Sequence, residues 1–270
     1  MTPTRPGPVP VLMYHEIARP AETTSRLAVP PDAFAEQLAY LHGEGFTTVT
    51  VAELRAVLAG GAGPLPDRTI VLTFDDGYED FHRRAMPLLD RYGFTATVFV
   101  TTGWIQDAGA RSAPRRPGRM LSWSQIEEAA HAGFEVGAHS RTHPQLDQLP
   151  GRLLREELHS SKAQLEDKLG SRVAGLAYPF GYYSVKVRET ARVLDHDYAC
   201  AVRNVIMNPG SDPLALPRLT VRKSTAMPVF QQIARGGNLR AIFRKDRALT
   251  RGWATVRHTR AAVGTVLHGH

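Results

Sequence analysis

Cysteine is almost missing from this sequence. Cys200 is the only cysteine in 270 residues, so the chain can form no internal disulfide bond. Long apolar runs are also missing, because no stretch of eighteen consecutive apolar residues occurs and a membrane-spanning helix needs about 20. The N-terminal residues MTPTRPGPVPVLMYH lack the apolar core of a secretory signal peptide. These absences exclude a disulfide-rich scaffold and a transmembrane helix, and they favour a cytoplasmic protein.

Nucleotide-binding signatures are absent as well. The glycine cluster at residues 60–63, followed by Pro64 and Pro66, matches neither a dinucleotide fingerprint nor a phosphate-binding P-loop. We therefore interpret this segment as a loop without chemistry.

Most of the chain has no excess of one charge, and the net charge of +7 comes from its C-terminal part. From Arg235 onward there are eight Lys or Arg residues and one acid, Asp246, whereas the preceding residues carry equal numbers of bases and acids. We expect a neutral main domain over residues 1–235 and a basic tail over residues 236–270. Such a tail is typically solvated and partly disordered, and its Phe243 and Trp253 allow peripheral contact with an anionic membrane.

What the sequence does contain is an alternation of strand and helix patterns. Apolar runs predict strands at residues 9–14, 46–51, 70–74, 96–101, 134–138, 173–180, 198–202 and 216–221. Helical patterns fall between them at residues 32–41, 52–59, 80–92, 122–131, 152–169 and 184–194. This alternation indicates a parallel sheet, and about seven or eight such strands predict a single distorted (β/α) TIM-like barrel.

The stretch IVLTFDDGYED at residues 70–80 is the first that suggests chemistry. A buried strand appears to end in two adjacent carboxylates, Asp75 and Asp76, followed by Gly77. Neighbouring side chains in an extended chain point apart, so one carboxylate can hold a metal while the other faces the space beside it. The alternative is an ordinary strand-ending turn, since Asp-Gly is a common turn dipeptide.

The stretch FEVGAHSRTH at residues 134–143 repeats the arrangement with His139 and His143. The four-residue spacing resembles that of helical zinc proteases, but Pro144 disfavours helical geometry at His143. We therefore place both histidines on a turn after a strand. Two His and one carboxylate suit zinc or another divalent transition metal and leave positions open for water and substrate.

Three motifs resemble those of a known family. TFDDG at residues 73–77, HSRTH at residues 139–143 and AYPFG at residues 177–181 are similar to the first three motifs of the polysaccharide deacetylases (NodB-homology, carbohydrate esterase family 4). Their order and spacing also fit, and the similarity covers roughly residues 9–230. The resemblance implies a hydrolase in which Asp76, His139 and His143 bind the metal.

The resemblance also implies roles beyond the metal ligands. Asp75 would be the general base, and the backbone N–H of Phe180 would be an oxyanion donor. Tyr178 and Pro179 of the same motif are candidates for the substrate side of the site. Trp123, at the start of a predicted helix, is a candidate for stacking on a sugar ring, with core packing as the alternative.

The sequence departs from the family pattern in two places. The usual late motif, an apolar strand ending in Leu-His that provides the general acid, is missing after Gly181. The N-terminal VLMYH resembles it, which implies a circularly permuted order, as in the poly-N-acetylglucosamine deacetylase branch, with His15 as the acid or, alternatively, only a strand cap. Ala177 stands where the family commonly has an Arg that holds the catalytic Asp, and Arg218 is the proposed substitute or a structural ion-pairing residue.

The function expected from the resemblance is metal-dependent removal of N-acetyl groups from a polysaccharide, oligosaccharide or glycoconjugate. The alternatives are hydrolysis of another amide or ester at the same site, and a carbohydrate-binding barrel without turnover. Zn²⁺ is the expected cofactor, and Co²⁺, Ni²⁺ or Fe²⁺ also suit the ligand set. An N-acetylated carbohydrate is the expected partner, and no nucleic-acid partner is expected.

Overall fold

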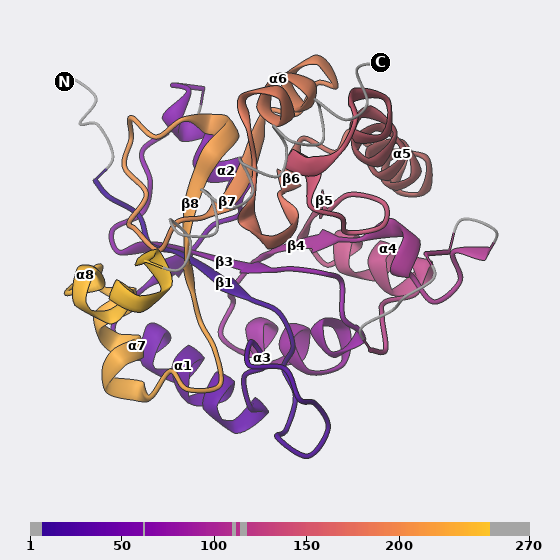
Figure 1. The fold of residues 1–270 in the computed structure, drawn as a ribbon. Coiled ribbons are helices and arrows are strands. Elements are labelled where there is room, and N and C mark those ends of the chain that lie inside the picture. Colours follow the sequence, from indigo (N-terminus) through magenta and orange to yellow (C-terminus); the bar gives the residue numbers. More distant parts are fainter. Residues whose placement is uncertain (1–6, 62, 110–111, 114–117, 249–270) are drawn as a thin grey trace.

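The computed structural model describes residues 7–61, 63–109, 112–113 and 118–248. Figure 1 shows strands at the centre of the molecule with helices around them. The strands are β1 (Val11–Tyr14), β2 (Thr47–Thr48), β3 (Thr69–Phe74), β4 (Thr97–Val100), β5 (Glu135–Ala138), β6 (Gly175–Ala177), β7 (Tyr198–Val202) and β8 (Leu216–Thr220).

All strand pairings between these elements are parallel, and the sheet closes on itself. The order is β1-β8-β7-β6-β5-β4-β3-β2, with an additional pairing between β1 and β3. Seven strands therefore form a closed barrel, and β2 lies outside it against β3. The predicted TIM-like barrel is confirmed, and the N-terminal strand β1 lies between β3 and β8.

The helices are α1 (Pro31–Gly43), α2 (Val51–Leu58), α3 (Met86–Arg91), α4 (Trp123–His131), α5 (Gly151–Leu169), α6 (Val185–Val193), α7 (Met227–Ala234) and α8 (Leu239–Ile242). Local sequence explains several of their ends. Ser122 caps α4 by accepting a hydrogen bond from the Gln125 N–H, and Ser184 caps α6 in the same way. Gly170 ends α5 with a φ of 62°, a left-handed conformation that favours glycine.

Three predicted elements differ from the structure. The strand predicted at residues 173–180 is reduced to β6, because Pro179 has no N–H for a ladder and Phe180 has a φ of 60°. The strand predicted at residues 46–51 keeps only the two residues of β2, which pairs with a single neighbour outside the barrel. The helix predicted at residues 80–92 begins as a π-helical turn, Phe81–Ala85, before α3.

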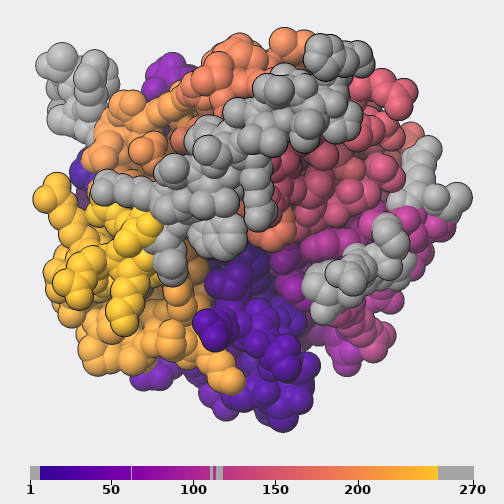
Figure 2. Space-filling view, in the orientation of Figure 1, coloured from indigo at the N-terminus to yellow at the C-terminus, as the bar shows by residue number. Residues whose placement is uncertain are grey.

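The C-terminal region differs from the predicted solvated tail. Leu239 of α8 and Phe243 just after it are buried in the same apolar core as Phe230 of α7. In Figure 2 the yellow segment that contains α8 lies against the orange α7 region. The packed domain therefore extends past the predicted boundary at residue 235, because two apolar side chains four residues apart face the barrel on one side of a helix. Trp253 lies outside the described residues.

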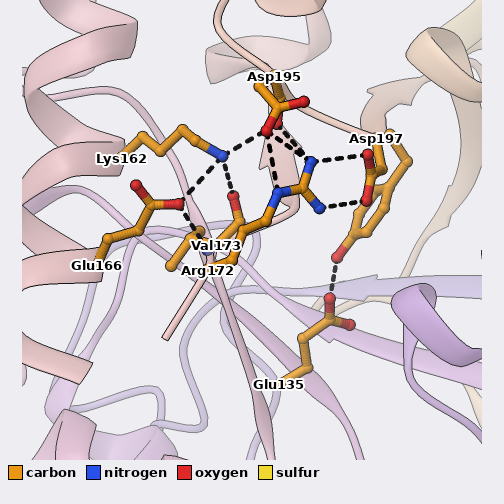
Figure 3. A network of polar contacts seen from close by, with 8 residues as sticks. Glu135, Lys162, Glu166, Arg172, Val173, Asp195 and Asp197 are labelled. Atoms are coloured by element: carbon orange, nitrogen blue, oxygen red, sulfur yellow. Dashed lines mark hydrogen bonds and ion pairs between the residues drawn. The ribbon is translucent and has the colours of Figure 1, made fainter. Parts of the chain in front are cut away.

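The amino-terminal end of the barrel is tied together by polar contacts (Figure 3). Arg172 pairs with both carboxylate oxygens of Asp197, at 2.6 and 2.9 Å, and Lys162 of α5 donates to the carbonyl oxygens of Val173 and Asp195. Glu135, the first residue of β5, accepts a hydrogen bond from Tyr198, the first residue of β7. None of the described helices is long and apolar enough to cross a membrane.

Candidate active site

The carboxyl end of β3 delivers two carboxylates to the end of the barrel opposite those contacts. All six residues of β3 are buried, and Asp75 continues the strand by donating its N–H to the carbonyl oxygen of Tyr14. At Asp76 the chain turns, because φ is 75° there and 84° at Gly77. This turn, and not the alternation of side chains in an extended strand, directs the two neighbouring carboxylates to different partners.

Asp76, His139 and His143 form a compact cluster of potential metal ligands. One ligand atom from each lies within 4.8 Å of the others. Nε2 of His139 is 3.4 Å and Nε2 of His143 is 3.3 Å from Oδ1 of Asp76. Asp76 and His139 are buried, and His143 is partly exposed. The structure thus brings together the three ligands predicted from sequence.

The surroundings of this cluster fit a divalent metal. Nδ1 of His139 lies 2.8 Å from the carbonyl oxygen of Ala177, which assigns the ring proton to Nδ1 and leaves the Nε2 lone pair facing Asp76. Oδ1 of Asp76 is buried and makes no hydrogen bond within the described chain. Burial alone would raise the pKa of Asp76, but the two histidine rings outweigh it and lower that pKa. A buried carboxylate oxygen without a hydrogen-bond partner, within 3.4 Å of two imidazole nitrogens, belongs to a donor set suited to zinc.

Arg218 holds the other carboxylate. Its Nη1 and Nη2 donate to Oδ1 and Oδ2 of Asp75 at 2.6 and 2.7 Å, and Nη1 also donates to Oγ1 of Thr73 at 3.1 Å. The Arg218 side chain is completely buried. Burial would raise the pKa of Asp75, but the Arg218 guanidinium, with His139, holds that pKa below its usual value. Asp75 is therefore a buried carboxylate that stays ionised.

His15 reaches the same region from the N-terminal strand. Tyr14 is paired with Phe74, so His15 and Asp75 follow side by side at the ends of β1 and β3. Nδ1 of His15 is buried and has no hydrogen-bond partner among the described residues. Burial lowers the pKa of His15, while the charges of Asp76 and Asp75 act in the opposite direction. The order of the strands in the barrel therefore brings an N-terminal histidine next to motifs that follow much later in the chain.

Of the YPFG motif, only Phe180 presents a side chain at the surface. Phe180 is 51% exposed, and its ring centroid lies 4.6 Å from that of His143. Tyr178 and Pro179 are buried, and the Tyr178 hydroxyl donates to the carbonyl oxygen of Leu214 at 2.9 Å. The Tyr178 side chain thus supports the motif from within the protein.

The indole beside the ligand cluster is Trp104. Its ring stacks on His143 with a centroid distance of 4.8 Å and an interplanar angle of 29°. Trp123, the sequence candidate, lies at the start of α4, packs against the core and has Nζ of Lys168 5.8 Å above its ring. Trp104 was missed by the sequence analysis, although it follows the buried strand β4 by only four residues and so belongs to the carboxyl end of the barrel.

Comparison with known proteins agrees with this geometry. The family model described as polysaccharide deacetylase matches residues 62–199, which is half of the chain and includes the ligand cluster and the YPFG motif. The chain belongs to the polysaccharide deacetylase family. His15 and Arg218 lie outside the matched region, before and after it.

Several known proteins are similar to this chain. YxkH of Bacillus subtilis, whose name places it among the polysaccharide deacetylases, is 28% identical over 69% of this chain and 62% of its own length. The poly-β-1,6-N-acetyl-D-glucosamine N-deacetylase of Escherichia coli K12 is 29% identical over 48% of this chain and 20% of its own length. The chain thus spans less than two thirds of these two relatives. The structure of the Streptococcus pyogenes deacetylase PplD in complex with acetate matches with a TM-score of 0.75 and 28% identity, over 85% of this chain and 99% of that chain.

Proposed function

We propose that this protein is a metal-dependent hydrolase that removes N-acetyl groups from an N-acetylated sugar. The observation that carries the proposal is the pair of buried carboxylates: Asp75 is held ionised by Arg218, and Asp76 stands beside His139 and His143. A protein that only binds carbohydrate has no use for an ionised base next to a metal site. Membership of the polysaccharide deacetylase family supports the same reaction.

Asp76, His139 and His143 would hold the metal, with zinc as the expected ion. A metal bound there would lower the pKa of a coordinated water and polarise the acetyl carbonyl. Contacts within the protein orient both histidine rings, since the Ala177 carbonyl fixes the tautomer of His139 and Trp104 packs on His143.

Asp75 would take the proton from the attacking water. Its pKa lies below the usual value for an Asp, so the carboxylate is in the basic form at neutral pH. Arg218 restricts it to one orientation through two parallel hydrogen bonds, which is the geometry that favours a positioned base.

Phe180 and His15 are candidates for stabilising the oxyanion and for protonating the departing amine. The Phe180 N–H would donate to the oxyanion that forms when water adds to the acetyl carbon. His15 would give a proton to the departing amine. Burial lowers the pKa of His15, and the carboxylates of Asp76 and Asp75 act against this lowering. In these roles Phe180 would donate a hydrogen bond to the oxyanion, and His15 would donate a proton to the amine.

Acetate release from sugars of defined length tests this function. We expect the wild-type protein, loaded with Zn²⁺ or Co²⁺, to release acetate from chitooligosaccharides or from short poly-β-1,6-N-acetylglucosamine, because the E. coli relative is named for the latter. Acetyl esters and N-acetylated amino acids serve as comparison substrates. Hydrolysis of those compounds with no acetate from any sugar would contradict the proposed substrate class, and no hydrolysis by the metal-loaded protein would favour a binding module.

A further inference from the structure

The segment that joins His139 to His143 has an unfavourable backbone conformation. Ser140 has a φ of 61° and His143 a φ of 60°, and residues other than glycine seldom adopt such positive values. Within the segment, the His143 N–H donates to Oγ of Ser140 at 3.0 Å. A loop of this kind needs contacts from its surroundings if it is to present His143 to Asp76.

On one side, the chain after β4 holds the carbonyl groups of this loop. The N–H of Thr102 donates to the Ser140 oxygen at 3.3 Å, and the N–H of Gly103 donates to the Arg141 oxygen at 2.7 Å. The approach at Gly103 is so close that a Cβ atom there would lie 2.5 Å from the Arg141 oxygen. Only glycine fits at this position without displacing the loop.

On the other side, one carboxylate holds the N–H groups. Oε2 of Glu157, in α5, accepts hydrogen bonds from the N–H of Arg141 at 3.0 Å and the N–H of Thr142 at 2.8 Å. Oε1 accepts from the Thr142 hydroxyl at 2.7 Å. The Glu157 residue is only 6% exposed, so these bonds are shielded from water.

We propose that Glu157 is a positioning residue for the metal site: its carboxylate fixes the backbone of Arg141 and Thr142 and thereby the direction of His143. The inference rests on the proposed function, because it assumes that Asp76, His139 and His143 bind a metal. Glu157 acts through the backbone of the two residues that precede the ligand His143. A residue with only a structural role in α5 would stabilise the fold without changing the affinity of this site.

The test compares three variants with the wild-type protein. Glu157→Ala removes all three hydrogen bonds, whereas the amide oxygen of Glu157→Gln can still accept both N–H groups. Glu156→Ala is the matched control, since Glu156 is the half-exposed neighbour and its Oε1 lies 3.9 Å from an Arg141 nitrogen. Zn²⁺ affinity is measured by competition with a chromophoric chelator, and the visible spectrum of the Co²⁺-loaded protein reports the ligand geometry.

We expect Glu157→Ala to bind Zn²⁺ about 10–100-fold more weakly and to have an altered Co²⁺ spectrum. Glu157→Gln and Glu156→Ala should remain close to wild type in both measurements. Should Glu157→Ala fail to fold, Glu157→Asp replaces it, because the shorter side chain keeps the charge but withdraws the oxygens from the loop. A folded variant without these hydrogen bonds that keeps the wild-type affinity and spectrum would overturn the inference.

Hydrogen exchange separates this inference from the proposed function. In the metal-free proteins, the Arg141 and Thr142 amides should exchange faster in Glu157→Ala than in wild type, because they lose their acceptor. A wild-type protein that binds no metal would contradict the proposed function while the amides still respond to the substitution. Unchanged exchange at both amides would instead contradict the inference that the Glu157 carboxylate fixes the backbone of Arg141 and Thr142.

Discussion

Replacing Asp75 by asparagine is expected to lower the rate of acetate release by about 10²–10⁴-fold, the contribution typical of a positioned general base. Asparagine has nearly the same shape, and its amide oxygen can still accept a hydrogen bond from Arg218. It cannot take a proton from water at neutral pH. Asp76 and the two histidines are untouched by the substitution, so the metal should still bind.

Acetate release and metal content of the same preparations provide the measurement. Circular dichroism shows whether Asp75→Asn is folded, which is necessary because Arg218 is left with a neutral partner in a buried site. Turnover close to wild type in a folded, metal-loaded variant would show that Asp75 is not the base. Loss of metal together with turnover would place Asp75 among the ligands.

Replacing Arg218 by methionine is expected to reduce the free energy of unfolding by about 3–5 kcal/mol, because Asp75 would remain buried without its counter-ion. Arg172 offers a matched control. It makes the same two-bond contact with Asp197 (Figure 3). Because its side chain is 45% exposed, Arg172→Met should cost about 1 kcal/mol or less.

The loss caused by Arg218→Met should also depend on pH. In the wild type the pKa of Asp75 is lowered, so the pair stabilises the protein above the unfolded pKa of Asp75 and loses this contribution as pH falls through the folded one. Without Arg218, burial dominates and raises the pKa of Asp75. The deficit should therefore shrink at mildly acidic pH, where Asp75 becomes neutral. Urea unfolding at neutral and at mildly acidic pH provides the measurement. An equal loss of unfolding free energy in Arg218→Met and Arg172→Met would contradict the expectation.

The sequence predicted the cluster of Asp76, His139 and His143 because its signal is local. Each candidate ligand lies within five residues of the end of an apolar strand, and the carboxyl ends of parallel strands meet at one end of a barrel. The resemblance to the family led to His15 and Arg218, and both lie on or just after predicted strands. The contact between Arg218 and Asp75, which are 143 positions apart, becomes visible only with the strand order in which β8 and β3 both pair with β1.

The positions of Trp104, Glu157 and α8 depend on tertiary packing, which short sequence patterns do not predict. Trp123 and Trp104 are equally plausible indoles in the sequence, but only the path of the chain after β4 brings Trp104 to His143. Glu157 reads as one charged residue of a long amphipathic helix, and its burial against the Arg141 loop comes from the way α5 packs on the barrel. The basic composition after Arg235 predicted a solvated tail, because charge counts give no weight to the two apolar side chains that anchor α8.

Metal removal and reconstitution of the wild-type protein test the central claim most directly. A chelator removes bound metal, and Zn²⁺ is then added back in steps while acetate release from the preferred N-acetylated sugar is measured. The Asp76, His139 and His143 cluster, the one such group among the described residues, predicts that the metal-free protein is inactive and that activity rises until one equivalent is bound. Full acetate release by the metal-free protein would contradict the account.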